Sequence, residues 1–349
     1  MSRFASFTGV VAGFQSTAIS PPGPAAPSQV EYTTAGTYSW TVPSGVTSIS
    51  ALVVGGGGGG RVIYAYDYYT TDLEKAHAAQ GGSGGAVAWM TNYAVTPGQV
   101  LTITVGAAGV GGSYTGVNAR VAPTAGGLSR IAIGATNLIT ANGGAGGGLA
   151  KYNGTAPDTK SYNTFHTGFT IGAGVTGAGV YGQAGANEGG ASMTFGAWGG
   201  GGAGSMNAST GTTKSNAYGG GGLGFSVTYS SGLPAHNYVS GAGGGVGIYG
   251  GSLSTASVSQ SGTSTHPYTG AYAAPGGSGG GAGSPALSTT SSILNTTSTG
   301  GGFGGGGGGW AARASSTSNG TKCNGAGGAV RIIWPGDVRF YPNTRTAGE

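Results

Sequence analysis

The sequence is short of charge, of cysteine and of long apolar runs. Charged residues make up 6% of the 349-residue chain, about a quarter of the usual share. A chain with so little charge has to pack compactly or assemble with other chains to stay in solution. The single cysteine, Cys323, allows no disulfide within the chain and is expected to be an inert small residue. No stretch of 18 consecutive apolar residues occurs, which argues against a transmembrane helix.

Patterns that support catalysis or metal binding are also scarce. Among the carboxylates only Asp67, Asp72 and Glu74 lie close together in the sequence, and Lys75 beside them indicates a solvated loop. The four histidines lack the spacing of metal ligands, which leaves a metal site assembled from distant residues as a minor alternative. Basic residues are scattered, whereas nucleic-acid binding requires a cluster. We therefore expect no enzyme, catalytic residue, metal, cofactor, nucleic-acid partner or membrane insertion.

Glycine is what the chain has in abundance, with 82 residues gathered largely in short tracts. The tracts alternate with segments rich in Tyr, Ser, Thr, Asn and Ala, and no sustained G-X-Y period joins them, which excludes collagen. The glycine and proline content approaches that of disordered chains, but 9% of the residues are aromatic, which argues against disorder. The tracts occupy residues 55–60, 146–148, 199–202, 219–222, 243–245, 279–281, 300–302 and 304–309.

Glycine tracts have a physical use in close packing of extended chains. A polyproline II helix has three residues per turn, rises about 3.1 Å per residue and makes no internal hydrogen bonds. Its amide and carbonyl groups therefore point outward, and without Cβ atoms several such helices can satisfy one another's backbone groups. Each six-residue tract would span about 19 Å. The sequence thus predicts a lattice of short polyglycine II helices with the intervening segments as loops.

The flanks of the glycine-rich region show the alternation of β-strands. Turn signals stand at Pro43, Pro97 and Gly134. The run 327–334 repeats the pattern of 84–89, since both enter an apolar strand from glycine, and we expect the C-terminal strand to return to the first β module. No helical period appears in 141–325, although 71–79 could form a short helix. Strands are predicted at 30–32, 36–42, 48–54, 85–90, 100–105, 130–133, 137–140 and 327–334.

These elements give a mainly β protein with almost no α-helix. Its predicted architecture is a small antiparallel β-sandwich module flanking a glycine-rich polyglycine II helix lattice with irregular loops. Along the chain we divide it into an N-terminal attachment arm (1–28), a β-rich module (29–140) with a Tyr-rich insertion at 61–80, a polyglycine II body (141–326), and a closing strand with a polar tail (327–349).

Two stretches carry a resemblance to a known family. Residues 32–43 with the tract 55–60 resemble the opening of glycine-rich domains in bacteriophage tail proteins. Residues 327–334 with 341–344 resemble the end of glycine-rich virion proteins of marine phages and cyanophages. The body between them is similar to the polyglycine II sandwich of adhesins at the tip of T-even-like long tail fibres. Those adhesins carry a substantial N-terminal attachment domain, whereas this sequence shows a short arm before its β module.

The resemblance implies a viral structural protein of a bacteriophage, a tail-fibre or tail-tip adhesin that acts in host attachment. The expected partners are other virion proteins, bound through the N-terminal arm, and a host surface receptor, either a polysaccharide or an outer-membrane protein. A homo-oligomer is expected, with a trimer favoured. The protein would be made in the host cytoplasm without a signal peptide and would reside in the virion, on the tail or outer surface.

The loops between the tracts have the composition of a binding surface, because Tyr, Ser, Gly and Asn are the residues that antibody paratopes favour. The same aromatic residues could instead cover the sides of the lattice or form subunit contacts. The candidate receptor-binding residues are Tyr64, Tyr66, Tyr68, Tyr69, Tyr152, Tyr162, Phe165, His166, Tyr229, His236, Tyr238, His266, Tyr268 and Tyr272.

Two other functions fit the same composition. The first is a head fibre, capsid decoration or other structural virion component that binds no receptor. The second is an ice-binding polyglycine II protein, which would require flat and regular arrays of Thr or Ala. The irregular loops of this sequence favour receptor binding over ice binding.

Overall fold

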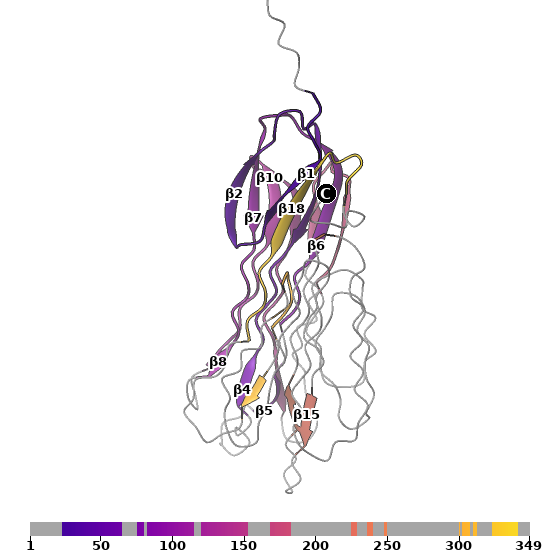
Figure 1. The fold of residues 1–349 in the computed structure, drawn as a ribbon. Coiled ribbons are helices and arrows are strands. Elements are labelled where there is room, and N and C mark those ends of the chain that lie inside the picture. Colours follow the sequence, from indigo (N-terminus) through magenta and orange to yellow (C-terminus); the bar gives the residue numbers. More distant parts are fainter. Residues whose placement is uncertain are drawn as a thin grey trace, which may run out of the picture.

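The computed structural model describes residues 23–64, 75–79, 82–114, 120–152, 168–182, 225–228, 236–239, 248–249, 300, 302–307, 310–312 and 323–340. Every regular element within these residues is a β-strand, and none of them forms an α-helix. Figure 1 shows an elongated molecule with a β-sandwich at one end, extended chains through its middle and small groups of strands at the other end. The predicted mainly β fold is confirmed.

Two five-stranded antiparallel sheets form the sandwich. Sheet A has the order β1 (Ser28–Tyr32), β18 (Ala329–Trp334), β3 (Ser48–Val54), β6 (Val87–Ala94) and β14 (Gly177–Val180). Sheet B has the order β13 (Phe169–Ile171), β11 (Thr136–Ala141), β10 (Ser129–Ile133), β7 (Val100–Val105) and β2 (Gly36–Thr41).

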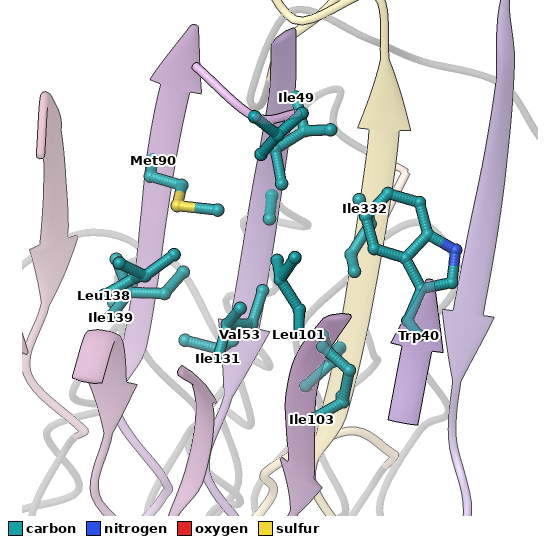
Figure 2. Packing of buried hydrophobic residues seen from close by; sticks show 14 of the residues in the cluster. Trp40, Ile49, Val53, Met90, Leu101, Ile103, Ile131, Leu138, Ile139 and Ile332 are labelled. Carbon is teal, nitrogen blue, oxygen red and sulfur yellow. The ribbon is translucent and has the colours of Figure 1, made fainter. Parts of the chain in front are cut away.

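The hydrophobic core lies between the two sheets. On β7 the alternation buries Leu101 and Ile103 against residues of sheet A such as Ile332, as Figure 2 shows. The rings of Trp40 and Trp334 face each other from opposite sheets with their centroids 5.7 Å apart. Each fully buried Leu or Ile contributes about 1.5–3 kcal/mol through removal of its apolar surface from water. The core therefore anchors the whole molecule at this end.

The strands follow the sequence pattern closely. The predicted return of the C-terminal strand is confirmed, because β18 pairs with both β3 and β1. The repeated pattern of 84–89 and 327–334 also has a structural meaning, since β6 and β18 are the two antiparallel neighbours of β3. The helix predicted over 71–79 is wrong where the structure describes it, because residues 75–79 form strand β5, which pairs with two other strands. Pairing across a sheet overrides weak local helix propensity here.

Below the sandwich, residues 55–60 run through the middle of a polyglycine lattice. Their amides donate in strict rotation to three other segments. Gly55 and Gly58 donate to residues 86 and 83, Gly56 and Gly59 to 127 and 124, and Gly57 and Gly60 to 326 and 323. A partner that recurs every third residue is the bonding pattern of a threefold polyproline II helix.

The carbonyl groups of the same tract accept from three further segments. Gly56 and Gly59 accept from residues 144 and 147, Gly57 and Gly60 from 109 and 112, and Gly58 from 307. Neighbouring members of the surrounding ring also bond to one another. In order around the central tract, the ring consists of residues 82–86, 142–147, 124–127, 106–112, 323–328 and 304–307. The predicted lattice is thus a central extended chain enclosed by antiparallel and parallel chains in alternation.

Close approach explains the glycines of the central tract. A Cβ added to Gly57 would meet the carbonyl of Gly305, and one added to Gly58 would meet the carbonyl of Ala145, both nearer than real Cβ atoms approach backbone. The amide and carbonyl groups of residues 55–60 are all within the buried part of the chain. Hydrogen bonds between tracts therefore replace side-chain packing as the source of cohesion.

The predicted sequence boundary at residue 140 does not coincide with the division of the structure in space. The sandwich includes β13 and β14 from beyond that boundary, while the lattice includes the earlier tract 55–60. Sandwich strands continue directly into lattice tracts, so the chain alternates between the two layers. One folding unit therefore extends over both.

Candidate binding end

The lattice tracts carry the chain away from the sandwich and bring it back. Residues 55–60, 106–112, 142–148 and 304–307 lead into short strands at the far end, as the positions of β4, β5, β8 and β15 show in Figure 1. These strands are β4 (Val62–Tyr64), β5 (Lys75–Ala79), β8 (Ser113–Tyr114), β9 (Arg120–Val121), β12 (Leu149–Tyr152), β15 (Phe225–Thr228), β16 (His236–Val239) and β17 (Trp310–Ala312). We call this group of strands the binding end.

Pairing joins distant parts of the sequence at the binding end. β12, β5, β16 and β15 form a four-stranded sheet in that order, β17 pairs in parallel with β4, and β8 pairs with β9. β4 contacts β5 and β8, and β17 contacts β16. The three small sheets are therefore neighbours, and lattice tracts lead directly into β4, β8 and β12.

Four of the predicted binding residues lie on these strands. Tyr64 is paired with Ala312, and Tyr152 with Lys75. On β16, His236 is paired with Thr228, while Tyr238 is paired with both Ser226 and Ala78. The structure thus brings backbone positions from three separate segments to one end. The other predicted residues lie outside the described residues: Tyr66, Tyr68, Tyr69, Tyr162, Phe165, His166, Tyr229, His266, Tyr268 and Tyr272.

The two ends of the described chain lie at the opposite end of the molecule. The amide of Ala25 donates to the carbonyl of Gly45, in the turn before β3. At the other terminus Arg339 donates to the carbonyl of Ser28, 3.0 Å away, and its own segment is tied to the start of β3 through Gly336. The predicted attachment arm therefore joins the sandwich on the side remote from the binding end.

A buried polar cluster on the outer face of sheet A was not predicted from the sequence. The guanidinium of Arg331 is fully buried and donates to Gln29 and to the carbonyl of Ile248. It lies 4.0 Å from Glu31 and 5.0 Å from the centre of the Tyr249 ring. A lone arginine inside an apolar strand, opposite a glutamate on another strand, is the sequence signal that could have revealed it. The cluster fastens residues 248–249 to the sandwich.

Hydrogen bonding within this cluster changes the chemistry of Tyr249. Its hydroxyl donates to Glu31 over 2.9 Å, and this bond raises the pKa of Tyr249 above the ordinary value, with burial and the charge of Glu31 acting in the same direction. Burial likewise raises the pKa of Tyr32 on β1. Both phenols therefore stay protonated at physiological pH, and the bond from Tyr249 to Glu31 helps to hold residues 248–249 on the sandwich.

Among the described residues, no three side chains of His, Cys, Asp or Glu lie close enough together to hold a metal ion. Within the same part of the chain, no helix has the length and apolar character needed to cross a bilayer. Cys323 is buried in the lattice, where its carbonyl accepts from Gly60.

Comparison with known proteins gives one match. Residues 33–252 match the family described as a glycine-rich domain. This range begins just before β2, includes the central tract and continues past the strands β15 and β16. A search of curated proteins returned no match.

Proposed function

The chain belongs to the glycine-rich domain family, and we propose that it is a bacteriophage virion protein, a tail-fibre or tail-tip adhesin that attaches the particle to its host. The sandwich carries the N-terminal arm that mounts the protein on other virion proteins. The binding end contacts a polysaccharide or an outer-membrane protein of the host surface.

One observation carries this proposal: the two ends of the described chain lie at the sandwich, and the strands of the binding end lie beyond the polyglycine lattice. The described chain starts and finishes at the sandwich, and the lattice delivers predicted aromatic positions such as Tyr64 and Tyr238 to the far end. An adhesin is mounted on the particle at one end and contacts its receptor at the other, which is the arrangement that two separate ends provide. A decoration protein without a receptor has no comparable need to bring strands from distant segments together at that end.

The mechanism is non-covalent recognition on a rigid support. Strands β4, β8 and β12 each begin directly after a tract whose backbone groups bond on several sides. Little conformational freedom then remains to be lost when a receptor binds, which favours affinity. Tyrosine contributes a large contact area with few rotatable bonds. Several copies on one particle convert weak single contacts into avidity.

Adsorption of the purified full chain to bacterial cells tests this function. Labelled protein is incubated with a panel of bacteria, and bound protein is measured with and without purified surface polysaccharide or outer-membrane protein as competitor. We expect saturable binding to cells of one host type, blocked by one class of competitor. Absence of binding to every host, combined with a location on the phage head by labelled imaging, would contradict the adhesin and support a structural decoration.

A further inference from the structure

The outer face of sheet B carries a regular array of hydroxyl groups. Because the core lies between the two sheets, Leu101 and Ile103 on β7 point inward, and Thr102 and Thr104 beside them point outward. The registers of the five strands place one outward residue of each strand in a single line. We call this line the first row, and its members in order across the sheet are Thr37, Thr104, Arg130, Thr140 and Thr170.

A second row of outward residues lies beside the first. Its members are Ser39 on β2, Thr102 on β7, Ala132 on β10 and Asn137 on β11. Neighbouring strands lie about 4.8 Å apart and the two rows about 6.8 Å apart, so the first row spans about 19 Å. Apart from the buried Thr140 and Ala132, every member of the two rows is at least partly exposed to solvent. The array is therefore open to a ligand.

One positive charge stands at the centre of this array. Arg130 is the only charged residue in the five strands of sheet B, and β10 is the middle strand. Its Nε donates to Thr104 and its Nη1 to Asn137, both over 3.4 Å, which is longer than an ordinary N–H···O bond. Its Nη2 donates to none of the described residues, and none of their carboxylates forms an ion pair with it. The guanidinium is therefore free to bind an anion.

The neighbour of Arg130 in the first row has an unsatisfied hydroxyl group. Thr140 is 7% exposed, and its Oγ1 has no hydrogen-bond partner among the described residues. A buried polar group without a partner lowers stability. Rotation about χ1 exchanges the hydroxyl of a threonine with its methyl group, and for Thr140 this rotation breaks no hydrogen bond. The first row thus holds a cation and a hydroxyl side by side whose bonding capacity the chain itself leaves unused.

We propose that the outer face of sheet B binds an acidic polysaccharide, at a second site remote from the binding end. Arg130 holds a carboxylate or sulfate group of the sugar chain, because a guanidinium can direct two parallel N–H groups at two oxygens of such a group. The hydroxyls and the amide of the two rows each donate and accept hydrogen bonds, which matches the hydroxyl groups of sugars. A sugar chain laid along the first row meets hydroxyls on both sides of the guanidinium.

The composition of the two rows favours a sugar chain over other polymers. Nucleic acids carry a phosphate on every nucleotide and are bound by clusters of Lys and Arg, whereas the rows contain one cation. Protein interfaces depend on aromatic and other large anchors, and neither row contains an aromatic residue. An acidic polysaccharide presents several hydroxyl groups for each charged group, which is the ratio of groups on this face.

This site goes beyond the receptor contact of the proposed function. Sheet B belongs to the sandwich, whereas the strands at the binding end lie beyond the lattice (Figure 1). A contact between the sandwich and acidic polymers of a cell surface keeps the protein close to that surface. The effective concentration of the receptor at the binding end then rises without any change in its own contacts.

Binding of the full chain to defined polymers tests the site. Biolayer interferometry measures affinity for immobilised heparin, which carries sulfates, for polygalacturonate, which carries carboxylates, and for neutral dextran. We expect the wild type to prefer an acidic polymer to dextran, and Arg130→Gln to bind that polymer at least about tenfold more weakly. Thr37→Val/Thr170→Val, which removes two exposed hydroxyls and keeps the branched shape, should weaken binding at least about threefold. The matched control is Arg120→Gln, which removes the same charge from β9 at the binding end.

Binding to heparin alone or to polygalacturonate alone supports the site and identifies the acidic group. Equal affinity for dextran, an equal effect of the two arginine variants, or tighter binding of duplex DNA than of both acidic polymers would overturn the proposal. If Arg130→Gln does not fold, the double threonine variant decides, and an unchanged affinity in that variant refutes the site. Cell adsorption is measured separately, so failure of polymer binding and failure of receptor binding are distinguishable.

Discussion

The Cα atom of Gly58 faces the carbonyl oxygen of Ala145 so closely that no Cβ fits between them. Gly58 also donates to Ser83 and accepts from Gly307, so its surroundings cannot retreat on one side without breaking bonds on another. This relationship makes the central tract the most sensitive part of the lattice.

The first prediction concerns that tract. Gly58→Ala should lower the free energy of unfolding by about 3 kcal/mol or more, which is at or above the upper end of the usual cost of overpacking. Gly306→Val should abolish soluble folding, because the Cβ at this position would meet the backbone of Gly82. The matched control is Gly327→Ala, whose Cβ would meet only the carbonyl of Gly106 at 3.9 Å. Soluble yield and thermal unfolding measure the difference. Equal stability of Gly58→Ala and Gly327→Ala would contradict the close-packed lattice.

The second prediction concerns the buried polar cluster. Arg331→Ala should destabilise the fold by about 3–5 kcal/mol, because it leaves Gln29 and the carbonyl of Ile248 without their donor in a buried site. Tyr249→Phe removes one hydrogen bond to Glu31 and should cost about 1–2 kcal/mol. Denaturant unfolding measures both values. A cost for Arg331→Ala no larger than that for Tyr249→Phe would show that the guanidinium is dispensable.

The third prediction concerns stability at high pH. The pKa values of Tyr249 and Tyr32 are raised above 10.0 in the folded protein, so folding favours their neutral forms. Their contribution to stability is complete below pH 10 and is lost as pH rises from 10 through the folded-state values. Unfolding free energies measured between pH 8 and the alkaline limit should fall above pH 10. The double variant Tyr32→Phe/Tyr249→Phe should show a shallower fall, and an identical slope would argue against these groups.

The fourth prediction concerns receptor binding. Alanine in place of Tyr64 and Tyr238, which occupy backbone positions at the binding end, should weaken adsorption to host cells at least about tenfold, as expected of aromatic anchors. Tyr181→Ala is the control, since Tyr181 is an exposed tyrosine that follows β14 beside Phe169, at the sandwich. Binding isotherms on whole cells decide the matter. A loss of adsorption in the control alone would place the receptor site elsewhere.

The fifth prediction concerns hydrogen exchange. Amides 55–60 all donate to carbonyls of neighbouring tracts and should be among the slowest to exchange, although they have no side chains to shield them. The amides of Ala125 and Leu128, which donate to none of the described residues, should exchange quickly. Mass spectrometry of peptide fragments after exchange measures both groups. Fast exchange across 55–60 would be incompatible with the lattice.

Local patterns were sufficient to predict much of this fold. Alternation over 100–105 identified β7, and the repeated entry from glycine identified β6 and β18 as related strands. The central position of residues 55–60 could not be derived in the same way, because six separate segments have to meet before their bonds define a centre. Polyglycine carries no side-chain pattern that distinguishes one partner from another.

The candidate site was predicted only at the level of composition. The pairing of Tyr152 with Lys75, or of Tyr238 with Ala78, depends on how far each tract extends before it turns, and the sequence alone does not set that length. The short helix considered over 71–79 is a local expectation, whereas residues 75–79 pair with strands from distant segments that a local pattern does not reveal. The Arg331 cluster was missed because its partners come from two segments far from Arg331 in the sequence.

The threefold period of the lattice also governs how its length can change. If one residue is added to a tract or removed from it, every later amide turns by a third of a revolution and points at the wrong neighbouring tract. A change of three residues restores every hydrogen-bond partner. Coordinated insertions of three residues would therefore lengthen the molecule in steps of about 9 Å while leaving both the sandwich and the loops intact. Descendants of one ancestor could in this way differ in reach by whole turns without redesign of either end.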